Sequence, residues 1–65
     1  MKSYSSREVI QILQAAGWYE VRCAGDHHKF RHPARAGLVT IPHPRKDMPI
    51  RTLKSIERQA GVHFE

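Results

Sequence analysis

Apolar residues recur three and four positions apart near both ends of the chain, and this spacing predicts two α-helices. The first starts at a capping box formed by Ser5 and Glu8, in which each side chain bonds the backbone N–H of the other residue. Gly17 stops the pattern, so we expect this helix over residues 6–16. The second helix has Pro49 in its first turn and Gly61 at its end, and its apolar stripe is Ile50, Leu53, Ile56 and Ala60.

Between the helices the sequence changes to the period-two alternation of β-strands. We expect strands over residues 18–24, 27–32 and 38–41, joined by a tight turn at residues 25–26 and a loop at residues 33–37. In the first strand Tyr19, Val21 and Cys23 alternate with Trp18, Glu20 and Arg22. Pro42 is expected to end the third strand, because proline cannot donate a hydrogen bond to a β-ladder.

This order of elements predicts an α+β domain of the form α-β-β-β-α. The strands make a three-stranded antiparallel sheet, and both helices cover its one apolar face. Phe30 is the one large apolar residue of the second strand and is expected to face the core. Alternation then places two histidines on the same side as Phe30, namely His28 and His32. The open face receives an imidazole and two cations, namely His27, Lys29 and Arg31.

At 65 residues the chain predicts one domain over residues 1–65, with a core too thin to enclose a large pocket as well. The single cysteine, Cys23, excludes an internal disulfide and a zinc site of several cysteines. A histidine-only metal site such as His28 with His32 is not expected, because that spacing suits a helix and these residues lie on a strand. We therefore expect no metal and no cofactor.

The chain is expected to act in the cytoplasm and away from membranes. A small domain without disulfides fits a reducing compartment. No apolar run approaches the ~20 residues that cross a bilayer. The polar residues 1–6 do not predict a signal peptide.

The net charge is +5, and eight of the eleven lysines and arginines lie between Arg22 and Lys54. Such a concentration of positive charge favours a nucleic acid or an acidic protein as partner. Four of the five histidines fall within residues 25–44. Histidine transfers protons near neutral pH, so imidazoles among cations suit the cleavage of a phosphodiester. RNA cleavage is thus the first hypothesis and RNA binding the second.

The order and spacing of several short motifs carry a family resemblance over residues 6–62. These motifs are Ala16-Gly17-Trp18, Gly25-x-His27-His28-x-Phe30-Arg31-His32-Pro33, Val39-Thr40-Ile41-Pro42-His43-Pro44, Lys46-Asp47-x-Pro49 and Gln59-Ala60-Gly61. The chain resembles the HicA toxins of bacterial HicA–HicB toxin–antitoxin modules. The resemblance implies a fold like that of a double-stranded-RNA-binding domain. It also implies endoribonuclease activity on mRNA and inhibition by a HicB antitoxin.

The resemblance maps the active-site histidine of the family onto His27. The preceding residue, Asp26, departs from the serine that is usual there, and an acid at this position would orient the histidine but repel phosphate. His28 is the second choice for the catalytic residue, since a bulge after Gly25 would exchange the two faces of the strand. The candidate phosphate-binding residues are Lys29, Arg31, Arg45, Lys46, Arg51 and Lys54. The last four flank the start of the second helix, whose free N–H groups also favour an anion.

The expected reaction is metal-independent, with His27 as general base on the ribose 2′-OH and a 2′,3′-cyclic phosphate as product. Lys29 or Arg31 would stabilise the charge on the phosphate oxygens. The general acid is left open between water, His28 and a lysine. The need for a 2′-OH predicts no action on DNA. Two alternatives stay open: a non-catalytic RNA-binding module, and an interaction protein whose cationic face docks an acidic partner.

Overall fold

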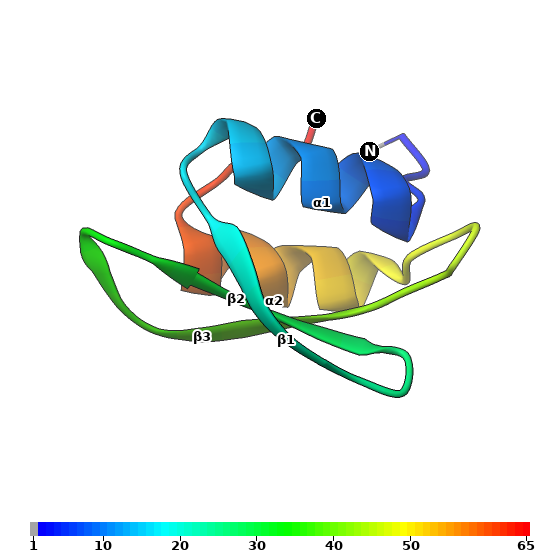
Figure 1. The fold of residues 1–65 in the computed structure, drawn as a ribbon. Helices are drawn as coiled ribbons and strands as arrows, with labels where there is room; N and C mark the ends of the chain where they lie inside the picture. Colours follow the sequence, from blue (N-terminus) through cyan, green and yellow to red (C-terminus); the bar gives the residue numbers. More distant parts are fainter. Residues whose placement is uncertain (1) are drawn as a thin grey trace.

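The computed structural model describes residues 2–65, and this part of the chain folds as the sequence predicts, into an α-β-β-β-α domain. The elements are α1 (Ser6–Ala15), β1 (Tyr19–Ala24), β2 (His27–His32), β3 (Arg35–Pro42) and α2 (Ile50–Ala60). Figure 1 shows both helices on the same side of the sheet. Within residues 2–65 neither helix is long and apolar enough to cross a membrane.

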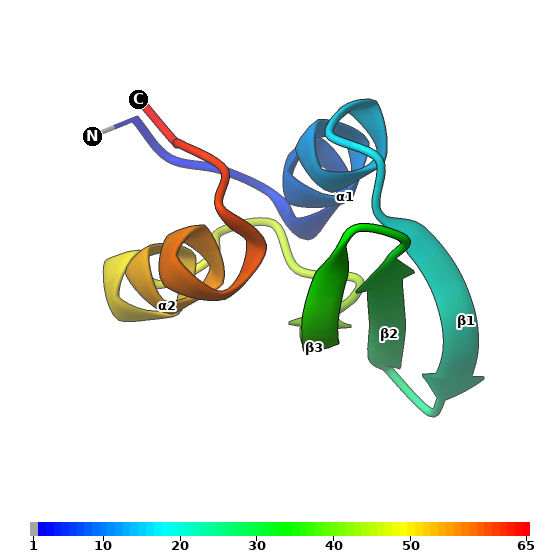
Figure 2. The ribbon, with the colours of Figure 1, turned by 90° about the vertical axis from the view of Figure 1, so that its left-hand side faces the viewer.

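The sheet is antiparallel, with β2 between β1 and β3 (Figure 2). Two irregularities interrupt its register. In β1, Glu20 pairs with Phe30 but Arg22 already pairs with Lys29, so the intervening Val21 is one extra residue, a β-bulge. In β3, residues 36–38 lie opposite a single residue of β2.

The third strand is longer at both ends than residues 38–41, the range expected from the sequence. It starts at Arg35, because the irregularity at residues 36–38 breaks the alternation without ending the pairing, and Gly37 supplies a φ of +99° there. It also includes Pro42, which pairs with His27. Because β3 is an edge strand, a proline nitrogen that points away from β2 removes no ladder bond.

The helix ends follow local signals. The Ser5–Glu8 capping box forms, with Glu8 N donating to Ser5 Oγ at 3.2 Å and Ser5 N donating to Glu8 Oε1 at 3.0 Å. Helix α1 ends at Ala15, one residue before the expected end. Helix α2 ends where Gly61 adopts a φ of +68°, a conformation that glycine enters without steric cost.

The core lies between the helices and the inner face of the sheet. Phe30 is completely buried at its centre, as predicted, and Trp18 is buried although it precedes β1 rather than starting it. Trp18 Nε1 donates a hydrogen bond to the carbonyl oxygen of Ala60, which joins the start of β1 to the end of α2. One residue of the predicted apolar stripe is not in the core: Ile50, in the first turn of α2, is 57% exposed.

Candidate active site on the central strand

The two adjacent histidines of β2 point to opposite faces of the sheet. Residues 27–30 pair with β3 in continuous register. The ring of His28 meets the ring of His43 at 5.1 Å between centroids, and His43 Nδ1 lies 2.7 Å from Ser6 Oγ in α1. His28 therefore lies on the helix side with Phe30, and alternation directs His27 to the open face. The side chain of His27 is 61% exposed there.

The open face around His27 carries further positive charge. Lys29 and Arg31 follow His27 at alternate positions of β2, and Lys29 Nζ donates to Thr40 Oγ1 at 3.4 Å. Arg22, on the neighbouring strand, is paired with Lys29, so it adds a cation to this face that is not among the predicted site residues. Tyr19, 49% exposed, stands opposite Arg31. This face thus offers several cations and an exposed aromatic ring, both of which suit a nucleic acid.

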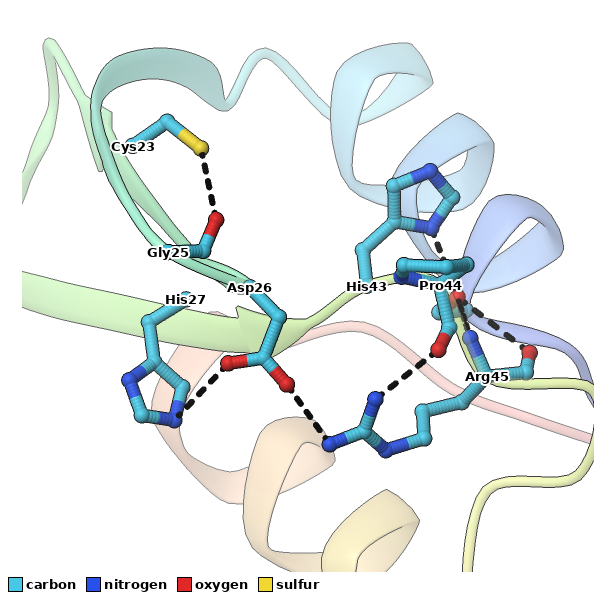
Figure 3. A network of polar contacts seen from close by, with 8 residues as sticks. Cys23, Gly25, Asp26, His27, His43, Pro44 and Arg45 are labelled. Carbon is cyan, nitrogen blue, oxygen red and sulfur yellow. Dashed lines mark hydrogen bonds and ion pairs between the residues drawn. The ribbon is translucent and has the colours of Figure 1, made fainter.

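An ion pair adjoins His27 at the turn between β1 and β2 (Figure 3). Asp26 Oδ1 lies 3.7 Å from His27 Nε2, and Asp26 Oδ2 accepts a hydrogen bond of 2.8 Å from Arg45 Nη2. The hydrogen bond from Arg45 lowers the pKa of Asp26, and the positive charge of that guanidinium lowers it further. Asp26 is therefore a carboxylate at neutral pH, with one oxygen toward the imidazole and the other toward Arg45.

Arg45 is held in place by the first residue of α1. Ser6 N donates to the carbonyl oxygen of Arg45 at 2.9 Å, and Arg45 N donates to Ser6 Oγ at 2.8 Å. Ser6 is only 1% exposed. His43 N also donates to the carbonyl oxygen of Asp26 at 2.8 Å, which ties the turn to the segment after β3. These bonds bring together residues 6, 26 and 45, which are far apart in the sequence.

The predicted phosphate-binding residues fall into three groups. Lys29 and Arg31 lie on the sheet face, and Arg45 reaches the turn beside His27. The remaining three are exposed near the start of α2, namely Lys46, Arg51 and Lys54. Pro49 caps that helix and, within residues 2–65, no side chain bonds the free N–H groups of its first turn. The start of α2 is accordingly a second place where an anion is favoured.

His32 has a structural role in this arrangement. Its Nδ1 accepts a hydrogen bond from Ala34 N at 2.9 Å, so the ring proton resides on Nε2, which lies 2.9 Å from the carbonyl oxygen of Ala16. The ring edge also meets Trp18 at 5.3 Å between centroids. These contacts connect the end of β2 to the end of α1.

His28 stands between two other potential metal ligands. Its Nδ1 lies 3.2 Å from both carboxylate oxygens of Glu20, and its Nε2 lies 3.6 Å from Cys23 Sγ. One donor atom of each residue lies within 4.8 Å of the other two. This mixed set differs from the sets of several cysteines or of two histidines considered from the sequence. The sequence does indicate that Cys23 and His28 lie opposite each other, because they flank the Gly25-Asp26 turn at equal distances.

The sequence and the fold are similar to those of a known family of bacterial proteins. Residues 6–62 match the HicA toxin of bacterial toxin–antitoxin systems. The chain belongs to the HicA toxin family. A similar solved structure, from a HicA3 and HicB3 toxin–antitoxin complex, has 29% sequence identity and a TM-score of 0.78, and the match covers 95% of this chain and 100% of that one. Comparison with the curated proteins by sequence yields no significant match. The family resemblance and the α+β, double-stranded-RNA-binding-like fold are therefore confirmed.

Proposed function

We propose that this HicA family member is a toxin that cleaves mRNA in the cytoplasm without a metal cofactor and is neutralised by a HicB-type antitoxin. One observation supports this most: the exposed imidazole of His27 shares a face with Lys29 and Arg31 and adjoins the Asp26–Arg45 ion pair. An RNA backbone on this face would bring its phosphates to the cations and one ribose to the imidazole.

In the proposed reaction His27 removes the proton of a ribose 2′-OH, and the oxygen attacks the adjacent phosphorus. The bond to the 5′-oxygen of the next nucleotide breaks, which leaves a 2′,3′-cyclic phosphate and a 5′-hydroxyl. Asp26, 3.7 Å from Nε2, stabilises the imidazolium that forms and leaves Nδ1 to act as the base. The cations that face the phosphate stabilise its developing charge.

The orientation of the histidines narrows the choice of general acid for the departing 5′-oxygen. His28 points to the helix side, toward Glu20 and His43, and its ring does not share the open face with His27. Lys29, two residues from His27 on the same face, or a water molecule is better placed to supply the proton.

The test is cleavage of a single-stranded RNA in EDTA by the wild type and by His27→Ala. General acid–base catalysis by one group is worth ~10²–10⁴ in rate, so His27→Ala is expected to lose activity by that factor. His63→Ala is the matched control, because His63 is 86% exposed and lies on the C-terminal segment. We expect cyclic phosphate ends and no cleavage of DNA.

The same experiment separates the alternatives. If His28→Ala loses activity and His27→Ala retains it, then the nuclease proposal survives with the other histidine as its base. If folded wild type binds RNA in a salt-sensitive manner but does not cleave it, the chain is a binding module instead.

The antitoxin part of the proposal is supported by the similar structure, which is that of a HicA3–HicB3 complex. Expression of the wild type alone is expected to stop bacterial growth, and co-expression of a HicB-type protein is expected to restore it. His27→Ala should permit growth while still binding the antitoxin. Undisturbed growth with folded wild type would contradict the toxin function.

A further inference from the structure

Cys23 and His28 face each other across the hairpin of β1 and β2. They form a directly opposed pair, two residues before and two residues after the Gly25-Asp26 turn. Cys23 Sγ lies 3.6 Å from His28 Nε2. Two ligands of a tetrahedral zinc ion, at ~2.0–2.3 Å from the metal, are about 3.5 Å apart, so this pair already has the separation of two zinc ligands.

The bulge in β1 adds a carboxylate to this pair. In a regular strand Glu20 and Cys23, three positions apart, would point to opposite faces. The extra residue at Val21 turns Glu20 to the same face as Cys23, and both of its carboxylate oxygens lie 3.2 Å from His28 Nδ1. Glu20 and Cys23 therefore lie on the same face as His28, one at each ring nitrogen, because of an irregularity that the alternation in the sequence does not reveal.

We propose that Glu20, Cys23 and His28 form a zinc-binding site on the helix side of the β1–β2 hairpin, with water in the fourth position. A thiolate, an imidazole and a carboxylate are the three side-chain ligands that Zn²⁺ takes in proteins, and the thiolate disfavours Mg²⁺ and Ca²⁺. One donor atom of each residue lies within 4.8 Å of the others. Cys23 faces His28 Nε2 and Glu20 faces Nδ1, so Glu20 has to rotate from Nδ1 toward Nε2 to join Cys23 on one ion.

The surroundings of the three residues allow an ion to enter and to be held. Cys23 is exposed, and the side chains of Glu20 and His28 are 39% and 20% exposed. The thiol donates a weak hydrogen bond of 3.4 Å to the carbonyl oxygen of Gly25. This bond is lost when the metal binds, and the thiol proton is released to solvent. The bound ion would link β1 to β2 and stabilise the folded state.

This site is distinct from the proposed ribonuclease centre. His27 is not a ligand and points to the opposite face of the sheet. His28, the second choice for the general base, is a ligand here, but the test of the metal site is metal binding and does not use RNA cleavage.

The experiment is a titration of the reduced, metal-free protein with Co²⁺, followed by displacement with Zn²⁺. We expect one Co²⁺ per chain, the thiolate-to-cobalt charge-transfer absorption and the visible bands of tetrahedral Co²⁺. Cys23→Ser should abolish the charge-transfer absorption, and Glu20→Gln should weaken binding at least about tenfold. Circular dichroism checks that each variant is folded; Cys23 and Glu20 are exposed, so both changes are compatible with the fold.

His63→Ala is the matched control, because His63 and Glu57 form a second histidine–carboxylate pair, 3.5 Å apart, in which no thiol takes part. This variant should bind Co²⁺ as the wild type does. The proposal is overturned if wild type gives no thiolate absorption or if Cys23→Ser binds Co²⁺ with unchanged spectrum and affinity. A stoichiometry of one metal per two chains with metal-dependent dimerisation would also overturn it, because the ligands would then come from two molecules.

Discussion

The hydroxyl oxygen of Ser6 lies 2.7 Å from Nδ1 of His43, across a sequence separation of 37 residues. The same oxygen accepts a hydrogen bond from Arg45 N, so the first residue of α1 fixes the segment after β3. That segment carries the guanidinium that binds Asp26 beside His27. A buried serine far from the catalytic candidate thereby positions one of its charged neighbours.

Replacement of this serine tests its importance for stability. Ser6→Ala removes the partner of His43 and of the Arg45 N–H at a site that is 1% exposed. Each of the two hydrogen bonds lost contributes about 0.5–1.5 kcal/mol, so we expect the free energy of unfolding to fall by about 1–3 kcal/mol. Urea denaturation measures it. Ser55→Ala, which removes a hydroxyl that accepts one bond from the exposed Gln59, should change stability by about 0.5 kcal/mol or less.

The sequence predicts those parts of the site that depend on local pattern. Alternation around Phe30 correctly separates His27 from His28, because β2 is regular over these residues. It fails in β1, where the bulge turns Glu20 toward the helices and Arg22 toward the open face. The bulged residue, Val21, is not a glycine and is common in regular strands, so the sequence does not indicate a bulge there. Only the pairing of the folded strands reveals it.

Long-range contacts are the other part that sequence reasoning could not supply. From the sequence, His43 has no specific partner and Arg45 is expected among the cations near the second helix. Both residues are positioned by hydrogen bonds to Ser6, which precedes them by more than 35 positions. In the sequence Ser6 only follows the capping residue Ser5, and nothing marks it as a long-range partner. Such a pairing depends on how α1 packs on the sheet, and nothing in either segment alone specifies it.

Gly17 and Gly37 provide a matched pair for a prediction about packing. Both have a φ of +99°, a region that costs a residue with a Cβ about 1–2 kcal/mol. A Cβ at Gly17 would lie 2.7 Å from His32 Nε2, whereas a Cβ at Gly37 would meet nothing within 4 Å. His32 is fixed by two hydrogen bonds, so its ring cannot move aside without losing them.

We therefore expect Gly17→Ala to destabilise the domain by at least about 1 kcal/mol more than Gly37→Ala, as overpacking in a fixed site usually does. Denaturant unfolding of both variants measures the difference. Equal losses of stability would mean that backbone conformation explains both effects and that the His32 ring adapts.

Asp26 allows a prediction about catalysis. Asp26→Ser removes a negative charge next to the proposed phosphate site. It also frees the Arg45 guanidinium from its 2.8 Å ion pair. We expect KM for RNA to fall about two- to fivefold, the effect of one exposed charge. We expect kcat to fall by a similar factor, because the imidazolium of His27 loses the carboxylate 3.7 Å away.

Steady-state cleavage of a defined RNA gives both constants for wild type and Asp26→Ser. Glu65→Gln is the control, because Glu65 is also an exposed acid but lies in the segment after α2, outside the predicted phosphate-binding residues. An unchanged KM with a reduced kcat would show that Asp26 orients His27 without repelling the substrate. An increase in KM would contradict the electrostatic argument.

The free energy of unfolding should fall at low pH, because two exposed carboxylates, Glu8 and Asp26, lose their negative charge there. Hydrogen bonds from the Ser5 backbone and from Lys2 lower the pKa of Glu8, and the hydrogen bond from Arg45 lowers that of Asp26. A group whose pKa is lower in the folded state stabilises that state above its unfolded pKa. The contribution is lost as the pH falls through the folded pKa. With unfolded values of about 3.9 for Asp and 4.3 for Glu, the loss should begin near pH 4 and continue below it.

The measurement is the urea midpoint of wild type, Glu8→Gln and Asp26→Asn at several pH values between about 6 and 2.5. Each variant lacks one of the two carboxylates, so each should be less stable than wild type at pH 6. The difference should shrink at low pH, where wild type loses the charge of that same carboxylate by protonation. The contribution of each group is expected to be small and to decrease with added salt, because both are exposed. If the difference in stability between wild type and a variant grows toward low pH, the charged carboxylate does not stabilise the fold, and the expected effect of its hydrogen bonds is contradicted.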